Sequence, residues 1–433
     1  MVMIIQPARN LTGTINLPGD KSISHRAAML ASIAEGTSRI SNFAESEDCA
    51  STLACMAGLG VEIDRNGSDV NVSGRGKYGL TVADSPLDCG NSGTTMRLLS
   101  GMLAGQPFET TLIGDESLSR RPMKRIIAPL SEMGAIIDDV DGHAPLTIVG
   151  KRPLTRIEFR LPVASAQLKS SVLLAGLFAE GETTVIEPVA TRDHTERMLR
   201  GFGVDVRVSE AEGGRRISVS GDDRLLAQDI TVPGDISSAA FFLVAAACIE
   251  GSELEIPNAG LNPTRTGVLD ILRRFGASIE IEDERESGGE PIGTLVVRHQ
   301  GRLGAVENRV EGEIVANIID EVPILAVFGT QIEGGIEIRD AGELRVKESD
   351  RIAAVAENLR RMGAEVEEFE DGLRVGRSSL KGAVIDSFGD HRIAMAFAVA
   401  GLFADGETEI RGAECAAVSF PAFFDVLSSV TNG

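Results

Sequence analysis

The chain has 433 residues, 43% of them hydrophobic, and carries a formal net charge of −22, with no tryptophan and one tyrosine. This length predicts two or three domains, and the hydrophobic content is that of a globular protein rather than a disordered one. The acidic charge disfavours partners such as nucleic acid or anionic lipid, and the scarcity of aromatic rings disfavours a surface that stacks bases or sugars.

Nothing in the sequence predicts a membrane span or export. The longest uninterrupted apolar run, residues 239–249, is shorter than the roughly 20 residues that cross a bilayer. The first residues, MVMIIQP, lack the features of a signal peptide. The five cysteines form no Cys-x-x-Cys pair and the five histidines are scattered, which argues against disulfides and against a metal site. We therefore expect a cytoplasmic protein without a metal.

One helical pattern recurs six times along the chain. Each copy begins at a small polar residue, is rich in Ala and Leu, ends at Gly and leads into a strand-like stretch, which are typical helix signals. These copies are predicted at residues 22–36, 92–105, 165–181, 237–251, 320–334 and 390–406. A second helix follows each copy and ends near a glycine, where helix termini favour left-handed backbone. These second helices are predicted at residues 53–63, 130–137, 198–206, 269–279, 359–366 and, in degenerate form, 423–430. Since one such β/α unit cannot bury its apolar faces alone, the six are expected to pack together.

A repeated tetrapeptide divides the six units into two groups of three. LPGD at residues 17–20 returns as VPGD at residues 232–235, each time just before a helix of the first kind. Pro-Gly marks turns and boundaries. We therefore predict one lobe at residues 20–232 and another formed by residues 1–19 and 233–433, with a hinge at Pro18-Gly19 and Pro233-Gly234. The alternative is that both sites are ordinary loop turns.

Polar and basic residues gather where the first helix of a unit begins. The segments are KSISHR at 21–26, NSGTT at 91–95, SAQ at 165–167, Asp320, and DHR at 390–392. Helix N-termini carry unpaired N–H groups and partial positive charge, so they bind anions. For any single segment, helix capping is the commoner role of Ser, Asn and Asp. Recurrence at equivalent positions favours a shared, locally positive anion site in an otherwise acidic protein.

Seven segments resemble the EPSP synthase family, in order, from about residue 5 to residue 428. They are LPGDKSISHR from residue 17, DCGNSGTTMR from 88, GDESLSRRPM from 114, ASAQLKS from 164, DEVPILA from 320, LRVKESDR from 344 and DHRIAM from 390. The resemblance implies an α/β (α+β) fold of two lobes, an inside-out α/β barrel of six βαβαββ repeats with three per lobe. It also implies transfer of the enolpyruvyl group of phosphoenolpyruvate to the 5-hydroxyl of shikimate 3-phosphate in the shikimate pathway, without a cofactor. The expected partners are these two small molecules, with no nucleic acid or membrane, and the chain is expected to be a monomer.

The resemblance also implies roles for individual residues. Those for phosphoenolpyruvate are Lys21, Asn91, Gly93, Thr94, Arg121, Gln167, Arg351 and Arg392. Those for shikimate 3-phosphate are Lys21, Ser22, Arg26, Ser165, Ala166, Gln167, Arg192, Asp320 and Lys347. Arginine suits such anions because its planar fork grips phosphate and carboxylate in two places. Glu348 is expected to give and retake the C3 proton and Asp320 to accept the hydroxyl proton, with Lys21 sharing proton transfer and stabilising charge.

Three positions bear on how this chain departs from the family pattern. Many members have a lysine before the final Ser/Thr-Phe-Pro turn, where this chain has Val418, so one contact to phosphoenolpyruvate is in doubt. Gly93 stands where alanine narrows the pocket against glyphosate elsewhere, which predicts sensitivity to glyphosate. Leu98 weakens this prediction because the sensitive plant-like branch has proline there.

Two alternatives remain, a sister enzyme with the same six-unit fold and, from another class of function, a scaffold or binding protein without activity. The sister enzyme, which transfers enolpyruvate to UDP-N-acetylglucosamine, typically has a Lys-Asn start and a reactive cysteine on a mobile loop, whereas residues 114–120 here contain no cysteine. A catalytically dead scaffold would be expected to lose Lys21, Arg121 or Glu348, and all are present.

Overall fold

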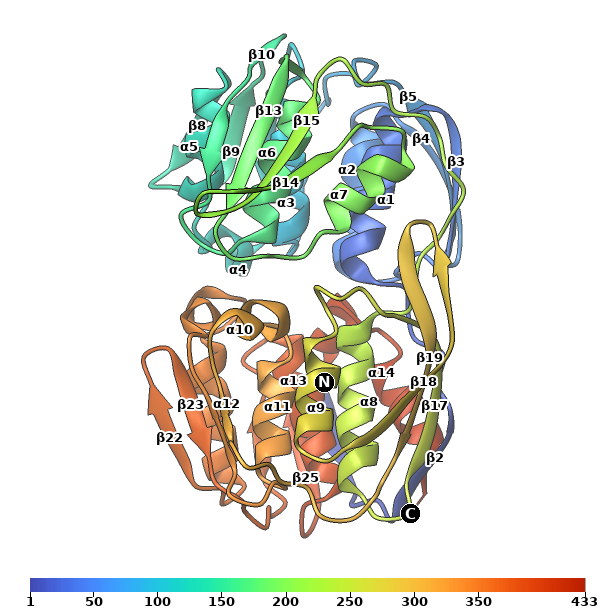
Figure 1. The fold of residues 1–433 in the computed structure, drawn as a ribbon, viewed down its shortest axis with the longest axis vertical. Helices are drawn as coiled ribbons and strands as arrows, with labels where there is room; N and C mark the ends of the chain where they lie inside the picture. Colours follow the sequence, from blue (N-terminus) through green and yellow to red (C-terminus); the bar gives the residue numbers. More distant parts are fainter. Residues whose placement is uncertain (433) are drawn as a thin grey trace. The chain divides into compact units, whose positions relative to one another are not determined.

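The chain passes between two structural units at its two Pro-Gly sites. In the computed structural model, which describes residues 1–432 (Figure 1), lobe I comprises Gly19–Val232 and Ser287–Glu290. Lobe II comprises Met1–Pro18, Pro233–Glu286 and the chain from Pro291 onward. The sequence prediction differs in placing Gly19 and residues 287–290 in the other lobe. Residues 287–290 group with lobe I because its helix α7 (His194–Gly201) bonds to them, His194 with Glu290 and Arg197 with the Gly289 carbonyl.

The larger sheets of lobe I share one strand order. Among the described residues, lobe I has the four-stranded sheets β16-β3-β5-β4, β6-β7-β9-β8 and β11-β13-β15-β14. In each, the first two strands pair in parallel and the others antiparallel. The strands of lobe I are β3 (Glu35–Ser41), β4 (Glu62–Asn66), β5 (Asp69–Arg75), β6 (Leu87–Asp88), β7 (Glu109–Ile113), β8 (Ile136–Val140), β9 (His143–Val149), β10 (Leu154–Thr155), β11 (Glu158–Arg160), β12 (Ala179–Glu180), β13 (Glu182–Glu187), β14 (Arg207–Ala211), β15 (Gly214–Ser220) and β16 (Ile230–Thr231). This recurring order is the structural counterpart of the sequence repeat.

Lobe II uses the two ends of the chain to complete its sheets. Strand β2 pairs in parallel with β17, and β1 pairs antiparallel with β25, so residues 1–18 join the C-terminal half. The sheet β20-β21-β23-β22 repeats the order seen in lobe I. The strands of lobe II are β1 (Val2–Ile5), β2 (Asn10–Thr14), β17 (Glu253–Gly260), β18 (Ser278–Ser287), β19 (Glu290–Arg298), β20 (Arg309–Val310), β21 (Ile336–Ile338), β22 (Val366–Phe369), β23 (Gly372–Val375), β24 (Val384–Asp386), β25 (Thr408–Arg411) and β26 (Thr431–Asn432).

The Ala- and Leu-rich helices form the core of each lobe. In lobe I these are α1 (Lys21–Ile33), α3 (Gly93–Ala104) and α6 (Ala166–Gly176), and nearly all of their residues are buried. In lobe II α8 (Ile236–Cys248), α11 (Val322–Gly329) and α13 (His391–Leu402) are buried in the same way. A helix that is apolar on every side is stable only inside a protein. Polar residues of these helices are therefore concentrated at their ends.

The remaining helices include those predicted to follow the first helix of each unit. They are α2 (Glu47–Gly58), α4 (Glu116–Ser119), α5 (Lys124–Glu132), α7, α9 (Gly267–Arg274), α10 (Glu313–Ile318), α12 (Arg351–Arg361) and α14 (Phe423–Val430), with the 3-10 turns η1 (Gly342–Val346) and η2 (Ala413–Val418). The glycine after five of these helices has positive φ, as predicted, from 84° at Gly60 to 105° at Gly134. A left-handed residue there lets the chain leave the helix and enter a strand.

Three predicted helix starts are wrong by one to two residues. Asp20, not Ser22, caps α1 by accepting from the Ile23 N–H, and Asp235, not Ser237, caps α8. Asp320 is not a cap, since α11 starts at Val322 after a turn. The aspartate of each (L/V)PGD tetrapeptide takes the capping position because its short carboxylate reaches the first free N–H groups.

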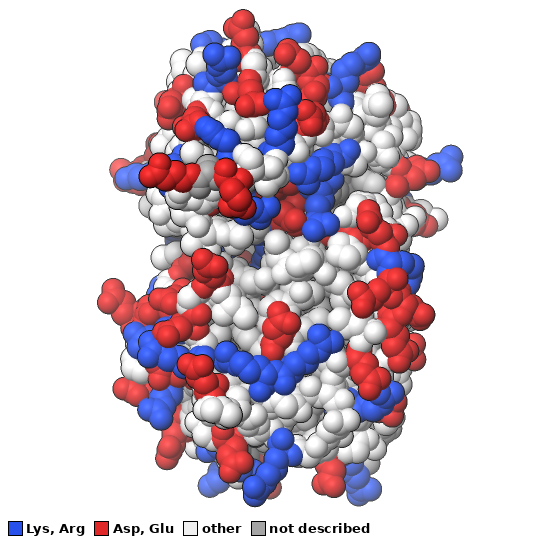
Figure 2. Space-filling model, viewed as in Figure 1, with Lys and Arg blue, Asp and Glu red and all other residues white. Residues whose placement is uncertain are grey.

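The surface carries both signs of charge. Figure 2 shows Lys and Arg interspersed with Asp and Glu over the visible face of the molecule. No helix within residues 1–432 is long and apolar enough to cross a membrane.

Candidate functional site

In lobe I, the predicted site residues lie at the beginnings of α1, α3 and α6. Lys21 is the first residue of α1, and its Nζ lies 2.9 Å from Oδ2 of Asp48, a buried residue of α2. Asp48 therefore holds the ammonium group at the start of the helix. Asp48 was not predicted, although it lies in the acidic first turn of α2, a position typical of helix N-termini.

Arg26, one turn further along α1, is buried and held by side chains from other helices. Its Nε donates to Thr195 Oγ1 at 2.7 Å, and its guanidinium also donates to the Ser22 carbonyl at 2.8 Å and to Ser170 Oγ at 2.9 Å. Ser170 Oγ and Thr195 Oγ1 are themselves 2.7 Å apart. Arg26 is thus fixed between α1, α6 and α7 before any ligand binds.

The turn before α3 brings together a second pair of predicted residues. Arg121 is buried and donates to Asn91 Oδ1 at 2.6 Å and to Ser117 Oγ at 3.2 Å. The Asn91 amide in turn donates to Asp115 Oδ2 at 2.7 Å. Ser92 caps α3 as predicted by accepting from the Thr95 N–H, and the Gly93 N–H donates to the Asn91 carbonyl at 3.1 Å.

Gln167 connects α6 to α3. Its amide donates to Thr94 Oγ1 at 2.9 Å and its carbonyl accepts from Arg97 at 2.8 Å. A Cβ placed on Gly93 would lie 2.6 Å from the nearer Arg97 nitrogen and 3.4 Å from Arg121 NH1. Arg97 is buried and was missed by the sequence prediction, although it ends the same DCGNSGTTMR motif.

Three further predicted residues of lobe I lie on α6 and on the loop before α7. Ser165 caps α6, as predicted, and Ala166 is the first residue of the helix. Arg192 lies between β13 and α7, directly after Thr191, whose N–H and hydroxyl both donate to Glu187 Oε2. The loop that carries Arg192 is therefore fastened to the end of β13.

His25, between Lys21 and Arg26, is buried and hydrogen-bonded to a chain of hydroxyl groups. Its Nδ1 lies 2.6 Å from Thr52 Oγ1, which lies 2.7 Å from Thr95 Oγ1, and Thr95 Oγ1 donates to Ser92 Oγ at 2.8 Å. Burial, with the neighbouring charges of Lys21 and Arg26, lowers the pKa of His25 well below its ordinary value. His25 is therefore a neutral connector between α1 and the cap of α3.

In lobe II, the predicted residues surround the guanidinium of Arg351. This side chain is 2% exposed and makes ion pairs with Asp390 at 2.8 Å, Glu348 at 2.6 Å and Asp320 at 3.3 Å. Burial alone would lower the pKa of Arg351, but Asp390, Glu348 and Asp320 more than offset it and raise the pKa above its ordinary value. Arg351 is therefore permanently charged, and both proposed acid–base carboxylates touch it.

Arg392 lies next to the same group. Its guanidinium donates to the Asp320 carbonyl at 3.0 Å and lies 3.7 Å from Asp320 Oδ2 and 3.8 Å from Oε1 of the buried Glu321. The Ser237 hydroxyl donates to the same Glu321 oxygen. Glu321 was not singled out by the sequence prediction, although it follows Asp320 in the DEVPILA motif.

Lys347 does not share a helical face with Arg351, as four-residue spacing would suggest. Lys347 follows η1, with extended backbone, whereas Arg351 is the first residue of α12, and Lys347 Nζ lies 3.6 Å from Glu343. The intervening Asp350 caps α12 and pairs with Arg345 at 2.9 Å, which breaks the helix at this point.

The two groups of residues differ in charge. In lobe I, Arg26, Arg97 and Arg121 donate to neutral side chains, and Lys21 pairs with Asp48. In lobe II, Arg351 and Arg392 lie among the carboxylates of Asp320, Glu321, Glu348 and Asp390, and Lys347 lies near Glu343. Lobe II therefore offers paired charges suited to proton transfer, whereas the locally positive site expected in lobe I stays a prediction.

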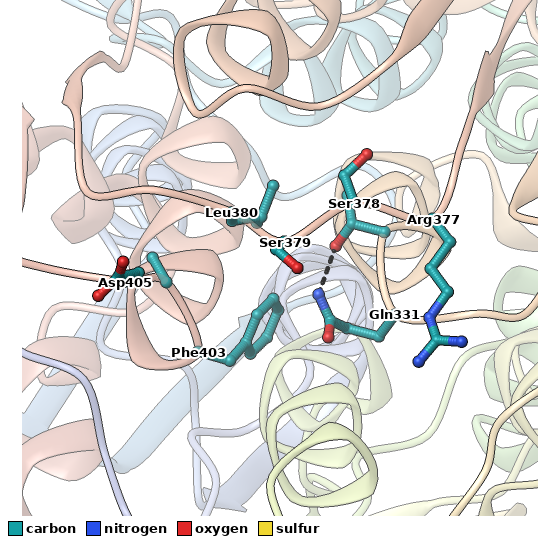
Figure 3. Close-up of a pocket in the computed structure, with 9 residues that line it drawn as sticks. Gln331, Arg377, Ser378, Ser379, Leu380, Phe403 and Asp405 are labelled. Carbon is teal, nitrogen blue, oxygen red and sulfur yellow. Dashed lines mark hydrogen bonds between the residues drawn. The ribbon is translucent and has the colours of Figure 1, made fainter.

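A polar cavity of about 570 Å³ in lobe II lies away from these residues (Figure 3). Its lining includes Gln331, Arg377, Ser378 and Phe403, and Gln331 donates to Thr330. Thr330 follows the C-terminus of α11, so the length of this helix, about 12 Å, separates the cavity from Asp320. Of the described side chains, none form a group of three or more His, Cys, Asp or Glu residues arranged to hold a metal ion.

Comparison with known proteins gives one consistent answer. The sequence model of the EPSP synthase (3-phosphoshikimate 1-carboxyvinyltransferase) family matches residues 5–427. The chain is 53% identical over 429 residues to a 3-phosphoshikimate 1-carboxyvinyltransferase of Solibacter usitatus, with 99% of each chain covered. It is also 53% identical over 436 residues to the enzyme of that name from Salinibacter ruber, with full coverage of both. An EPSP synthase structure from Acinetobacter baumannii is 44% identical and superposes with a TM-score of 0.88, covering 99% of this chain and 98% of the other.

Proposed function

The chain belongs to the EPSP synthase family, and from this premise we propose how its residues divide the work of the family reaction. It transfers the enolpyruvyl group of phosphoenolpyruvate to shikimate 3-phosphate, in the shikimate pathway of aromatic amino acid biosynthesis. The products are 5-enolpyruvylshikimate 3-phosphate and phosphate. The proposal concerns which residues bind each substrate and which move protons.

Shikimate 3-phosphate is bound by residues of α1, α6 and the Arg192 loop, together with Asp320 and Lys347. The residues proposed are Lys21, Ser22, Arg26, Ser165, Ala166, Gln167, Arg192, Asp320 and Lys347. Support comes from the fixed position of Arg26 among Ser22, Ser170 and Thr195, because a guanidinium that is already oriented loses little conformational freedom on gripping a phosphate.

Phosphoenolpyruvate is bound by the turn before α3 and by arginines of both lobes. The residues proposed are Lys21, Asn91, Gly93, Thr94, Arg121, Gln167, Arg351 and Arg392. The partial positive charge at the N-terminus of α3 and the Arg121–Asn91 pair support this assignment in lobe I. In lobe II, an incoming carboxylate or phosphate would have to compete with Asp320 and Glu348 for Arg351.

The chemical step is an addition followed by an elimination. The 5-hydroxyl oxygen attacks C2 of phosphoenolpyruvate and gives its proton to Asp320, while Glu348, entering as the carboxylic acid, protonates C3. The resulting tetrahedral ketal then loses phosphate from C2, which takes up the proton from Asp320, as Glu348 retakes a proton from C3 and the double bond is restored. The assignment of Glu348 to proton transfer at C3 rests on its 2.6 Å contact with Arg351. This contact holds a carboxyl group that can transfer a proton beside a cation that binds phosphoenolpyruvate in the family. Lys21 stabilises charge and shares in proton transfer.

We further propose that the sheet order repeated in both lobes corresponds to the family's inside-out α/β barrel of six βαβαββ repeats, three per lobe. The chain crossings at Pro18-Gly19 and Pro233-Gly234 are proposed as the hinge. Burial of the core helices in each lobe, with sheets sharing one strand order, supports this architecture.

Release of phosphate from mixed substrates tests the function. The purified protein is incubated with phosphoenolpyruvate and either shikimate 3-phosphate or UDP-N-acetylglucosamine. We expect phosphate only with shikimate 3-phosphate. Release with the nucleotide sugar would favour the sister reaction, and no release with either would favour a catalytically inactive binding protein.

A further inference from the structure

Lys169, in the second turn of α6, is a fully buried cation to which the reaction assigns no role. Its side chain is 0% exposed, and Nζ lies 2.9 Å from Glu187 Oε2 and 2.7 Å from Glu196 Oε1. Nζ also donates to the Thr191 carbonyl at 3.5 Å. An ammonium group has three N–H donors, so these acceptors can satisfy all of them. A charge is retained in such surroundings only when its partners compensate its burial.

The acceptors of Lys169 are distributed along one short stretch of chain. Glu187 is the last residue of β13, Thr191 lies in the loop and Glu196 is in the first turn of α7. Lys169 therefore fastens this loop at its beginning, its middle and its end. Arg192 is the next residue after Thr191, so the path of the chain at Arg192 depends on the Lys169 contacts.

The same helix also orders other residues proposed for shikimate 3-phosphate. Ser165 caps α6, and Ser170, the neighbour of Lys169, accepts from Arg26. Thr195, the neighbour of Glu196, accepts from Arg26 as well. The Asn91–Arg121 pair, which we assign to phosphoenolpyruvate, is instead oriented by Asp115 and Ser117.

We propose that Lys169 is a positioning residue that sets the Arg192 loop for shikimate 3-phosphate and thereby governs affinity for the acceptor but not for the donor. The proposal rests on the function proposed above, in which Arg192 contacts this substrate. Lys169 itself contacts no substrate and acts through the loop.

Two variants of the buried network test the proposal. Lys169→Met removes the ammonium group at similar side-chain length but leaves Glu187 and Glu196 without it. The triple variant Lys169→Met/Glu187→Gln/Glu196→Gln also removes the two carboxylate charges, so that it keeps the experiment informative if the single variant does not fold. Lys124→Met, at an exposed position at the start of α5, is the matched control.

Binding of each substrate is measured by titration calorimetry and by steady-state KM. In both network variants we expect Kd and KM for shikimate 3-phosphate to rise about tenfold or more, with KM for phosphoenolpyruvate within about threefold of the unaltered protein. The control should match the unaltered protein. Equal rises in KM for both substrates would overturn the proposal, because a purely structural role would not affect one substrate more than the other. Normal affinity for shikimate 3-phosphate in a folded triple variant would overturn it as well.

A double-mutant cycle with Arg192→Met shows whether Lys169 acts through Arg192. When Arg192 is already removed, Lys169→Met should change acceptor affinity by less than about twofold. Persistence of the full effect in that background would contradict positioning through this residue. Phosphate release by the unaltered protein separately checks the proposed function. The calorimetric Kd does not depend on turnover. Failure of the Lys169 proposal can therefore be distinguished from failure of the proposed function.

Discussion

The Arg351 guanidinium is buried against the Asp390 carboxylate, with Nε and Oδ2 2.8 Å apart. The same carboxylate caps α13 by accepting from the Arg392 N–H at 2.9 Å. One aspartate thus orients both of the lobe II arginines that we assign to phosphoenolpyruvate. Asp390 was predicted as a helix start but not as a determinant of the site.

Asp390→Asn tests this dual role. Asparagine can still cap the helix, but the buried Arg351 loses the compensating charge of Asp390. We expect the free energy of unfolding to fall by about 3 kcal/mol and KM for phosphoenolpyruvate to rise by about tenfold. Denaturant unfolding and steady-state kinetics measure these effects. Asp425→Asn, at an exposed position in α14, is the control, and an equal loss of stability there would contradict the explanation.

Glu348→Gln tests the assigned proton transfer at C3. The amide keeps the size of the side chain and a hydrogen-bond acceptor for Arg351 but cannot exchange a proton. We expect kcat to fall by about 10²–10⁴-fold while both substrates still bind, because this is the usual contribution of a general acid or base. Glu357→Gln, which alters an exposed ion pair of α12, should leave kcat unchanged. Near-normal turnover of Glu348→Gln would remove this residue from its assigned role.

Gly93→Ala tests the predicted sensitivity to glyphosate. The added methyl group would lie 2.6 Å from the nearer Arg97 nitrogen, so the Arg97–Gln167 contact or the adjoining Arg121 has to shift. We expect the unaltered protein to be inhibited competitively with phosphoenolpyruvate, and the variant to show a higher inhibition constant for glyphosate and a higher KM for phosphoenolpyruvate. Gly201→Ala, where an added Cβ meets nothing within 4 Å, is the control. An unaltered protein that resists millimolar glyphosate would contradict the prediction.

His25 predicts a loss of stability in mild acid. Its pKa is lowered by burial and by Lys21 and Arg26, so the unfolded chain takes up a proton below about pH 6.5 while the folded chain does not. The unfolded state then binds more protons than the folded state. The free energy of unfolding therefore decreases as the pH is lowered, by up to about 1.4 kcal/mol per pH unit from this group.

Urea unfolding between pH 7.5 and pH 5.5 (about one unit on either side of the ordinary histidine pKa) measures this contribution. His25→Gln should show a weaker dependence of stability on pH than the unaltered protein. His143→Gln, on the partly exposed strand β9, is the control. An unchanged pH dependence in His25→Gln would show that His25 is protonated equally in both states.

Much of the organisation could be predicted from sequence because it depends on nearby residues. Helix starts at Ser92, Ser165 and Asp390 were correctly predicted from capping residues, and the glycines after the second helices have the expected positive φ. Errors arose where two polar residues competed, as Asp20 and Ser22 do at α1. Asp320 was misplaced as a cap because α11 begins at Val322, with Glu321 in the capping position.

The repeat, the approximate positions of the core helices and the family follow from the amino-acid sequence, because capping, periodicity and motifs depend on residues a few positions apart. Which charged side chains pair with one another follows from the packing of the folded chain. Arg351 pairs with Asp320, in the turn before α11, and with Asp390, the cap of α13, and Lys169 pairs with Glu187 and Glu196 from the two ends of a loop. The partner of a long charged side chain depends on which elements pack around it and how deeply it is buried. Neighbouring positions in the sequence do not specify this.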